Sequence, residues 1–173
     1  MAKPNQIMPG YTAMMWCQSG STPSPFSDAN LSTWVAQVTT LVGTVHGGTG
    51  ASGVQIPVEQ VPDFGSDDAS ASFSVAGART GAKITVQDAV SSLSVTCAWN
   101  PSDTAMALIQ ADGYNGAIVR TYVISVSDGT KTIAYAFNAR VGGLKWSTPT
   151  AGESKFMFTL HPTGGTSYGW SNP

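Results

Sequence analysis

Charged residues are unusually scarce in this sequence. Its 173 residues include 8 Lys or Arg and 10 Asp or Glu, so charged residues make up 10% of the chain, whereas about 25% is usual for a soluble domain. The net charge is −2, and the few cations are scattered along the chain. Because binding to nucleic-acid phosphates requires clustered cations, the sequence excludes tight or sequence-specific nucleic-acid binding.

The chain has few charged residues but no lack of apolar ones, which make up 42% of it. A monomer with so few charges has difficulty staying soluble. Composition therefore favours a protein whose surface is largely covered by copies of itself. The alternative is a β protein rich in Ser, Thr and Gly, whose neutral polar groups do the solvating.

Long apolar runs and cysteines are also scarce. The sequence has no apolar run of about 18 residues, the length that indicates a membrane-spanning helix, and its first ten residues lack the apolar core of a signal peptide. We therefore expect a protein made in a cytoplasm, with no membrane partner. Cys17 and Cys97 each lie in an apolar stretch, and we predict two buried free thiols rather than a disulfide.

Histidine is too rare for most catalytic sites. The two histidines, His46 and His161, are isolated from each other and from other chemically active residues, so we expect surface or interface roles for both. A G-x-S-x-G match at residues 165–169 is followed by only four residues and by no histidine, whereas a nucleophile elbow needs a following helix and a later histidine.

Two further motif matches also fail on their spacing. Residues 77–83 resemble a phosphate-binding loop but lack the adjacent Gly-Lys-Ser/Thr of that motif. The acidic stretch around Asp67 and Asp68 lacks the ligand spacing of a calcium loop, and we interpret it as a solvated acidic loop. With no acid, base and nucleophile to name, we predict that the protein is not an enzyme and has no cofactor and no metal.

Residues 117–140 give the clearest local prediction, a long β-hairpin. Asp128-Gly129 separates two alternating runs, and Asp-Gly is a strong signal for a type I′ turn. A two-residue loop places Tyr122 opposite Tyr135 and Ile124 opposite Ile133. One face of this hairpin is bulky and suited to a core, although Arg120 interrupts it. The other face is small and uncharged, and comprises Thr121, Val123, Ser125, Thr132, Ala134, Ala136 and Asn138.

Strand and helix signals elsewhere predict a mostly antiparallel β domain with one helix. Short strands are expected at 12–18, 93–99 and 156–160, with a Gly/Ser tail from 163 to 173. Asn100, followed by Pro101, indicates the N-cap and first position of a helix over 102–111, which Gly113 ends. Residues 43–90 are rich in glycine and irregular, with Pro57 restricting 54–61 to an edge strand or an extended arm.

The order of these features resembles a known family. In the first part of the chain, Met8-Pro9-Gly10 leads to Met15-Trp16, the Ser19-Gly20 step follows, and Ser27-Asp28 precedes Trp34. In the second part, the strand Leu93–Trp99 is followed by Asn100-Pro101 and a helix, then by the long hairpin, and last by Phe156–Leu160 with its glycine-rich end. In this order and spacing the chain is similar to the major tail tube protein of long, non-contractile phage tails of the lambda type. The resemblance covers most of the chain apart from residues 43–90. Proteins of this type can add an immunoglobulin-like domain, and we expect none here and therefore no surface adhesion role.

The resemblance implies one tail tube domain over residues 1–173, folded as an antiparallel β-sandwich or partial barrel with a flanking helix. It implies a structural virion protein located in the tail, after assembly in the host cytoplasm. Six subunits would form each ring, and stacked rings would conduct DNA without binding it specifically. The partners would be further copies of the chain, the tail terminator, the tape measure and the baseplate or tip proteins.

Two parts of the sequence fit roles in such a tube. The small face of the hairpin, Thr121 to Asn138, is the candidate lumen or inter-subunit wall, because neutral side chains would let DNA slide. The extended region 43–90 is the candidate stacking arm, ordered only on assembly, with anchors at Val54, Ile56, Val58, Phe64 and Phe73. We expect rapid amide exchange across 45–85 in the monomer.

Two alternatives stay open on the sequence alone. One is the inner tube of a contractile tail or a secretion system, which would share the fold and the ring. The other is a monomeric β-sandwich module that binds a receptor or a carbohydrate through exposed aromatic residues such as Tyr114, Trp146 or Trp170.

Overall fold

The computed structural model describes residues 13–20, 53–63, 66–73, 82–90, 92–127, 132–163 and 167–171. For 66–73, 82–90, 127, 132–133 and 167–171 the description is of the backbone alone. Among these residues no helix is long and apolar enough to cross a membrane.

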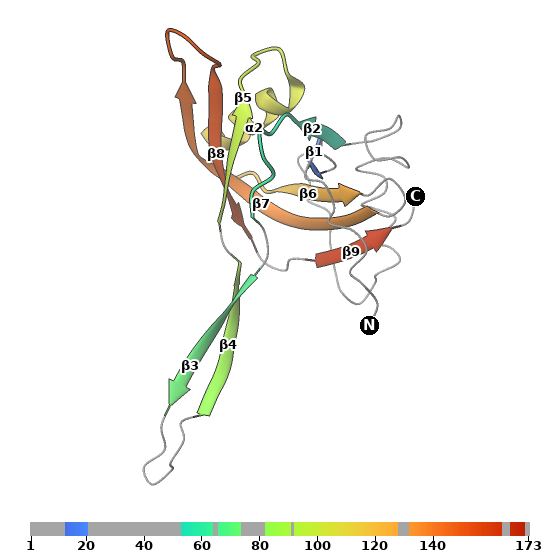
Figure 1. The fold of residues 1–173 in the computed structure, drawn as a ribbon, viewed down its shortest axis with the longest axis vertical. Helices are drawn as coiled ribbons and strands as arrows, with labels where there is room; N and C mark the ends of the chain where they lie inside the picture. Colours follow the sequence, from blue (N-terminus) through green and yellow to red (C-terminus); the bar gives the residue numbers. More distant parts are fainter. Residues whose placement is uncertain are drawn as a thin grey trace, which may run out of the picture.

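Most of the described chain forms one antiparallel sheet (Figure 1). The strand order is β2-β1-β6-β7-β8-β5, and β9 pairs with β7 beside this path. The strands are β1 (Ala13–Gln18), β2 (Gly53–Ile56), β5 (Leu93–Ala98), β6 (Arg120–Ser127), β7 (Thr132–Ser147), β8 (Lys155–Pro162) and β9 (Ser167–Ser171).

The residues after β2 link the two ends of this strand order. Pro57 has no N–H to donate to a ladder, and β2 ends immediately before it. Val58 then forms an isolated antiparallel bridge with Cys97 of β5, and the Glu59 N–H donates to the Thr96 carbonyl at 3.0 Å. The sheet therefore curls into a partial barrel, one of the two forms that the family resemblance implied, and 54–61 begins as the edge strand that Pro57 indicated.

The hydrophobic core fills the inside of this curl, beneath the helix α2 (Thr104–Asn115). Alternate residues of each strand supply it, as the two-residue period of a strand requires. Its largest fully buried side chains are Tyr122, Phe137, Phe156, Phe158, Met15, Ile56, Ile109, Ile124 and Leu160. The bulky hairpin face is thus confirmed as a core face.

The β6–β7 hairpin has a different register from the one predicted. Tyr122 lies opposite Phe137, Ile124 opposite Tyr135, and Ser127 opposite Thr132. Each pairing is two residues further along β7 than a two-residue Asp-Gly loop would give, so the prediction of that loop was wrong. Because a shift of two residues preserves the two-residue period, each side chain that the structure describes in the β6–β7 pairing keeps the face that the sequence predicted.

Strand β7 is longer than predicted and bends in its second half. Its first half pairs with β6, whereas residues 139–147 pair with β8. The pairing with β8 shifts between Gly142 and Lys145, and Gly143 has a φ of 62°. A residue with positive φ in a ladder is typical of a bulge that bends the strand, and here it carries β7 from one part of the sheet to the other.

The predicted helix is present but begins and ends later than expected. Asp103, not Asn100, is the N-cap, and its carboxylate accepts from the N–H groups of Ala105 at 2.8 Å and Met106 at 3.2 Å. Asn100 instead forms a turn before the helix, with its Oδ1 accepting from the Ser102 N–H at 3.0 Å. Both residue types are good caps, so sequence alone did not separate them.

Gly113 lies inside α2 and does not end it. A Cβ placed there would come within 2.7 Å of Leu144 on β7, so glycine permits the close approach of helix and strand. The helix ends at Gly116, which has a φ of 63° and donates its N–H to the Asp112 carbonyl at 2.8 Å. This is a left-handed C-cap.

Residues 66–90 contain a second, two-stranded sheet, β3 (Ser66–Phe73) paired with β4 (Ala82–Val90). It extends well away from the main sheet in Figure 1. The predicted acidic loop around Asp67 and Asp68 was therefore wrong, because both residues lie in β3, which begins at Ser66. The predicted tail after 163 was also wrong in part, since β9 lies there and pairs with β7.

Candidate functional site

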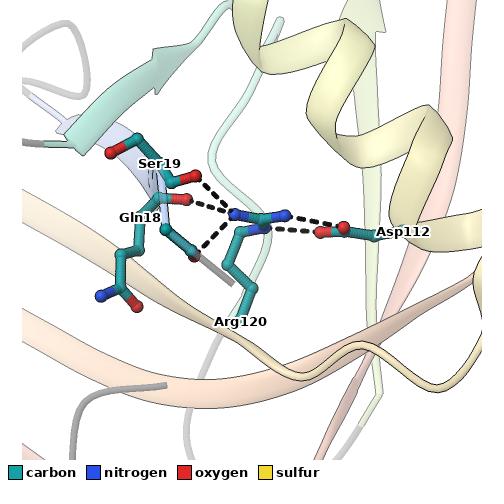
Figure 2. A network of polar contacts seen from close by, with 5 residues as sticks. Gln18, Ser19, Asp112 and Arg120 are labelled. Carbon is teal, nitrogen blue, oxygen red and sulfur yellow. Dashed lines mark hydrogen bonds and ion pairs between the residues drawn. The ribbon is translucent and has the colours of Figure 1, made fainter. Parts of the chain in front are cut away.

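Arg120, the charge that interrupts the bulky hairpin face, is the centre of a buried polar cluster (Figure 2). Arg120 is 4% exposed and Asp112 is 1% exposed. Arg120 Nε donates to Asp112 Oδ2 at 2.5 Å, and Nη2 donates to Oδ1 at 2.7 Å. This two-bond geometry is the strongest form of an arginine–carboxylate pair.

The remaining nitrogen of Arg120 holds the end of β1. Nη1 donates to the carbonyls of Gln18 and Ser19 at 3.0 Å each, and to that of Gly20 at 2.7 Å. Figure 2 shows the guanidinium between Asp112 on the helix and the carbonyls of Gln18 and Ser19 at the end of β1. Arg120 therefore ties together the last turn of α2, the start of β6 and the chain leaving β1.

The electrostatics of this cluster favour a positioning role rather than chemistry. The hydrogen bond to Asp112 raises the pKa of Arg120 above its already high usual value, so the guanidinium cannot exchange protons near neutral pH. Burial raises the pKa of the neighbouring Cys17 thiol to about 12, against a smaller lowering by Arg120. Protonated thiols are poor nucleophiles.

Both cysteines are buried and free, as predicted. Burial raises the pKa of the Cys97 thiol to about 12 as well, with a further contribution from the charge of Glu59. Burial similarly raises the pKa of Tyr122, whose buried hydroxyl has no hydrogen-bond partner in the part of the chain that the structure describes. These groups belong to the core.

The small hairpin face is covered within the single chain. Its members Thr121, Val123, Ser125, Ala134 and Ala136 are all buried, and Asn138 is half-buried. The side chain of Thr132 lies outside the described side chains.

Part of what covers this face is Trp16 of β1. Trp16 lies opposite Val123 in the register, and its indole N–H donates to Ser125 Oγ at 3.3 Å. Thr121 Oγ1 donates to Asn138 Oδ1 at 2.7 Å across the hairpin. A wall facing an open bore would be exposed in the single chain, so a lumen role for these residues stays a prediction, and it requires that the covering groups move on assembly.

The predicted arm residues separate into two groups. Ile56 is buried in the core, and Val54 and Val58 pack against it, so these three are anchored in the barrel of the single chain. Phe73 is the last residue of β3, whereas Phe64 lies outside the described residues. The projecting part of the region 43–90 is therefore β3–β4.

A polar groove of about 480 Å³ lies at the root of β3–β4. Pro62 and Asp63 from the chain entering β3 contribute to it, as do Ser92 and Ser94 from the chain leaving β4. From β8, Lys155 Nζ reaches Glu59 Oε1 at 2.7 Å. Exposed His161, also on β8, forms a hydrogen bond of 3.0 Å between its Nδ1 and the Ser92 hydroxyl. The predicted surface location of His161 is confirmed, and His46 lies outside the described residues.

Exposed aromatic residues are few in the described part of the chain. Tyr114, near the end of α2, is 73% exposed, and Trp99 and Trp146 are each 39% exposed. Trp146 packs against Phe156, with ring centroids 5.3 Å apart. Trp170 lies in β9, where only the backbone is described. The described residues contain no group of three or more His, Cys, Asp or Glu that could hold a metal ion.

Sequence comparison gives no relative for this chain. No family model matches it, and no curated protein matches it. Its resemblance to tail tube proteins therefore has to be judged on the fold.

Comparison with solved structures does find similar folds. The sheath/tube terminator of an extracellular contractile injection system, PVC, in its extended state, matches with a TM-score of 0.64 at 12% identity, over 96% of this chain and 99% of the terminator chain. The tail tube protein of SPP1 matches with a TM-score of 0.57 at 14% identity, over 96% of this chain and 80% of the SPP1 chain. The chain therefore has a tail-tube-like fold, with an antiparallel β sheet and a flanking helix among its described residues.

Proposed function

We propose that this chain is a structural virion protein, the building block of a phage tail tube. Copies join into rings of six, the rings stack, and the bore conducts DNA into the host without binding it specifically. The observation that carries this proposal is the likeness to the SPP1 tail tube over 96% of the chain. The proposed partners are further copies, the tape measure, the tail terminator and the baseplate or tip proteins.

The charge content of the chain supports assembly on independent grounds. With 10% charged residues, a surface that remained exposed would be poorly solvated. Burial of that surface between copies removes the difficulty. A neutral bore also fits DNA passage, because clustered Lys and Arg would hold the phosphates.

The projecting β3–β4 hairpin supports stacking between rings. A two-stranded hairpin is marginally stable on its own, and this one extends away from the barrel (Figure 1). We propose that β3–β4 is the stacking arm, whereas Val54, Ile56 and Val58 fix its root to the barrel.

We keep the small hairpin face, Thr121 to Asn138, as the proposed lumen or inter-subunit wall, and it has its own test. Ala136→Cys introduces a thiol on this face, and the native thiols are buried. A maleimide that labels Ala136→Cys in assembled tubes but not in the monomer supports a lumen wall. Protection in both states contradicts a lumen wall, because a residue that lines the bore would be labelled in tubes.

Negative-stain electron microscopy of concentrated protein tests the function. We expect annular particles and rods with a central channel. Compact single particles alone, across a range of salt and pH, would contradict the proposal. Light scattering separates this outcome from the binding-module alternative, which predicts a stable monomer whose exposed Tyr114 and Trp146 contact a glycan.

A second candidate function is a ring that ends a tube. It is favoured by the likeness to the sheath/tube terminator, which has the higher TM-score and is covered over 99% of its length. A terminator predicts rings that do not elongate into rods at any concentration. If rods form, density of a sheath around native tubes would separate a contractile from a non-contractile tail.

A further inference from the structure

The β3–β4 hairpin continues a pairing that begins in the barrel. Val58 forms an antiparallel bridge with Cys97 of β5. Further along, Ser66 of β3 pairs with Val90 of β4. The chain that contains Val58 leads into β3, and β4 leads into β5. The same two stretches of chain are therefore paired on both sides of the root, once in the barrel and once in the hairpin.

Between these two pairings, the two stretches of chain differ in length by one residue. Ser66 lies eight positions after Val58, whereas Cys97 lies seven positions after Val90. An extra residue on one of two paired strands defines a β-bulge, which disrupts the ladder locally and bends the strand that carries it. The chain that enters β3 therefore cannot stay in register with β5 throughout the root.

Side-chain burial places the irregularity at Glu59 and Gln60. Val58 and Val61 both pack against the core, although residues that share one face of a regular strand are two positions apart. Glu59 and Gln60, which lie between them, are both exposed. The alternation of a strand is thus broken at these two residues, and we infer that the regular pairing with β5 ends there.

Beyond this point the backbone faces the polar groove instead of a partner strand. The Glu59 N–H donates to the Thr96 carbonyl at 3.0 Å. Residues two apart on a strand turn their backbone groups to the same side, so the backbone of Ser94 faces the entering chain as that of Thr96 does. In the described part of the chain, however, no backbone hydrogen bond joins residues 60–63 to β5. The groove of about 480 Å³ is lined by both.

Two exposed side-chain contacts tie the root to β8, one on each side of the groove. On the entering side, Glu59 pairs with Lys155 at 2.7 Å. On the leaving side, the Ser92 hydroxyl bonds His161 Nδ1 at 3.0 Å, immediately before the pairing of β5 with β8 begins at Leu93. Exposed ion pairs and single hydrogen bonds contribute little to stability, so these contacts favour one orientation of the hairpin without fixing it.

We propose that the root of β3–β4 is a hinge. The unpaired residues 60–63 on the entering side and Ser92 on the leaving side absorb the changes in φ and ψ, as a few residues at the ends of elements do in hinged proteins. The hairpin turns about them as one body, and the two contacts with β8 favour the orientation in Figure 1. The hinge belongs to the single chain, so this inference goes beyond the proposed function and does not depend on it.

A disulfide on the leaving side restricts the hinge. Ser92 and His161 follow directly on the pairing of Leu93 with Leu160. Opposite residues of an antiparallel pair have Cα atoms about 4.5–5.5 Å apart, a separation that a disulfide can span. Ser92→Cys with His161→Cys therefore links the leaving chain to β8, and because both native thiols are buried, the new pair oxidises selectively.

Double electron–electron resonance measures the motion in the monomer. Spin labels attached to p-acetylphenylalanine, in place of exposed Tyr114 on α2 and of Phe73 at the far end of β3, leave all thiols free. We expect a broad distribution of distances that the disulfide narrows about twofold and that reduction restores. Lys155→Gln removes the contact with Glu59 and should widen the distribution, whereas the matched change Lys145→Gln, at an exposed lysine on β7, should not.

Equal widths in the wild type, the disulfide-linked chain and Lys155→Gln would show a rigid root and overturn the hinge. If a labelled chain does not fold by circular dichroism, amide exchange of the unlabelled wild type gives a second test. A hinge predicts fast exchange at Gln60, Val61 and Asp63, and strong protection there would contradict it. Neither measurement requires rings or rods, so failure of the hinge and failure of the proposed function are observed separately.

Discussion

Replacing Arg120 with methionine leaves Asp112 buried without its counter-charge. Asp112 is 1% exposed, and breaking a buried pair by removing one partner costs about 3–5 kcal/mol. We therefore expect Arg120→Met to lower the free energy of unfolding by about that amount in urea titrations followed by tryptophan fluorescence. Arg120→Met with Asp112→Leu removes both charges and should recover part of the loss, because the carbonyls of Gln18, Ser19 and Gly20 still lose their donor. An equal loss in the single and the double variant would contradict an electrostatic origin.

The buried hydroxyl of Tyr122 lowers the stability of the fold, and replacing Tyr122 with phenylalanine removes that hydroxyl. Its hydroxyl is fully buried and has no hydrogen-bond partner, and such an orphaned group costs about 1–3 kcal/mol. The ring itself stacks with Phe137 at 6.0 Å, a contact that phenylalanine retains. We expect Tyr122→Phe to raise the free energy of unfolding by about 1 kcal/mol in the same titrations, and a loss of stability would show that the hydroxyl is bonded.

The buried thiols of Cys17 and Cys97 are expected to make the folded protein less stable at alkaline pH. Burial raises the pKa of each thiol from 9.0 to about 12, so between these values the unfolded chain releases protons that the folded chain retains. Stability is therefore complete below pH 9 and falls as pH rises, by about 1.4 kcal/mol per pH unit for each thiol. Between pH 9 and 10, below the ordinary pKa of tyrosine, we expect denaturation under reducing conditions to show this slope and Cys17→Ala to reduce it by about half. A flat profile from pH 8 to 11 would contradict the assigned burial.

The N-cap of α2 gives a test at the level of one element. Asp103 accepts from two N–H groups of the first turn, and replacing an N-cap by alanine costs about 0.5–2 kcal/mol. We expect Asp103→Ala to lower the free energy of unfolding by about 1 kcal/mol. Asn100→Ala, which removes only the turn before the helix, should cost less, and the reverse order would restore Asn100 as the cap.

The same helix shows how far sequence reasoning reaches. The existence of α2, its buried face through Ala105, Met106 and Ile109, and its place after β5 all follow from local pattern. Its ends did not, because Asn100 and Asp103 are both good caps and because Gly113 serves packing against Leu144 rather than termination. Local propensity ranks such positions, but tertiary contacts decide among them.

The hairpin illustrates the same division for strands. The two-residue period assigned the described side chains of β6, and those of β7 up to Asn138, to their faces, and it did so despite a register error of two residues. What the sequence did not indicate is that the small face is covered in the single chain, because Trp16 comes from a strand more than 100 residues away. The Arg120 cluster was missed for the same reason. A single charge in an apolar run was the available signal, and its partners Asp112 and Gln18–Gly20 lie on other elements.

Hydrogen exchange distinguishes the two parts of the region 43–90 once the protein assembles. In the single chain, β2 pairs with β1 and Ile56 is in the core, so we expect slow exchange there, in contrast to the rapid exchange that the sequence predicted for all of 45–85. The β3–β4 pair forms a sheet of its own, and a two-stranded hairpin opens readily, so its amides should exchange rapidly in the monomer. If β3–β4 is the stacking arm, its amides become protected in tubes, while those of β2 and of the β6–β7 core hardly change. Equal protection of β3–β4 in monomer and tube would exclude it from the ring-to-ring contact, whatever the microscope shows of the tube itself.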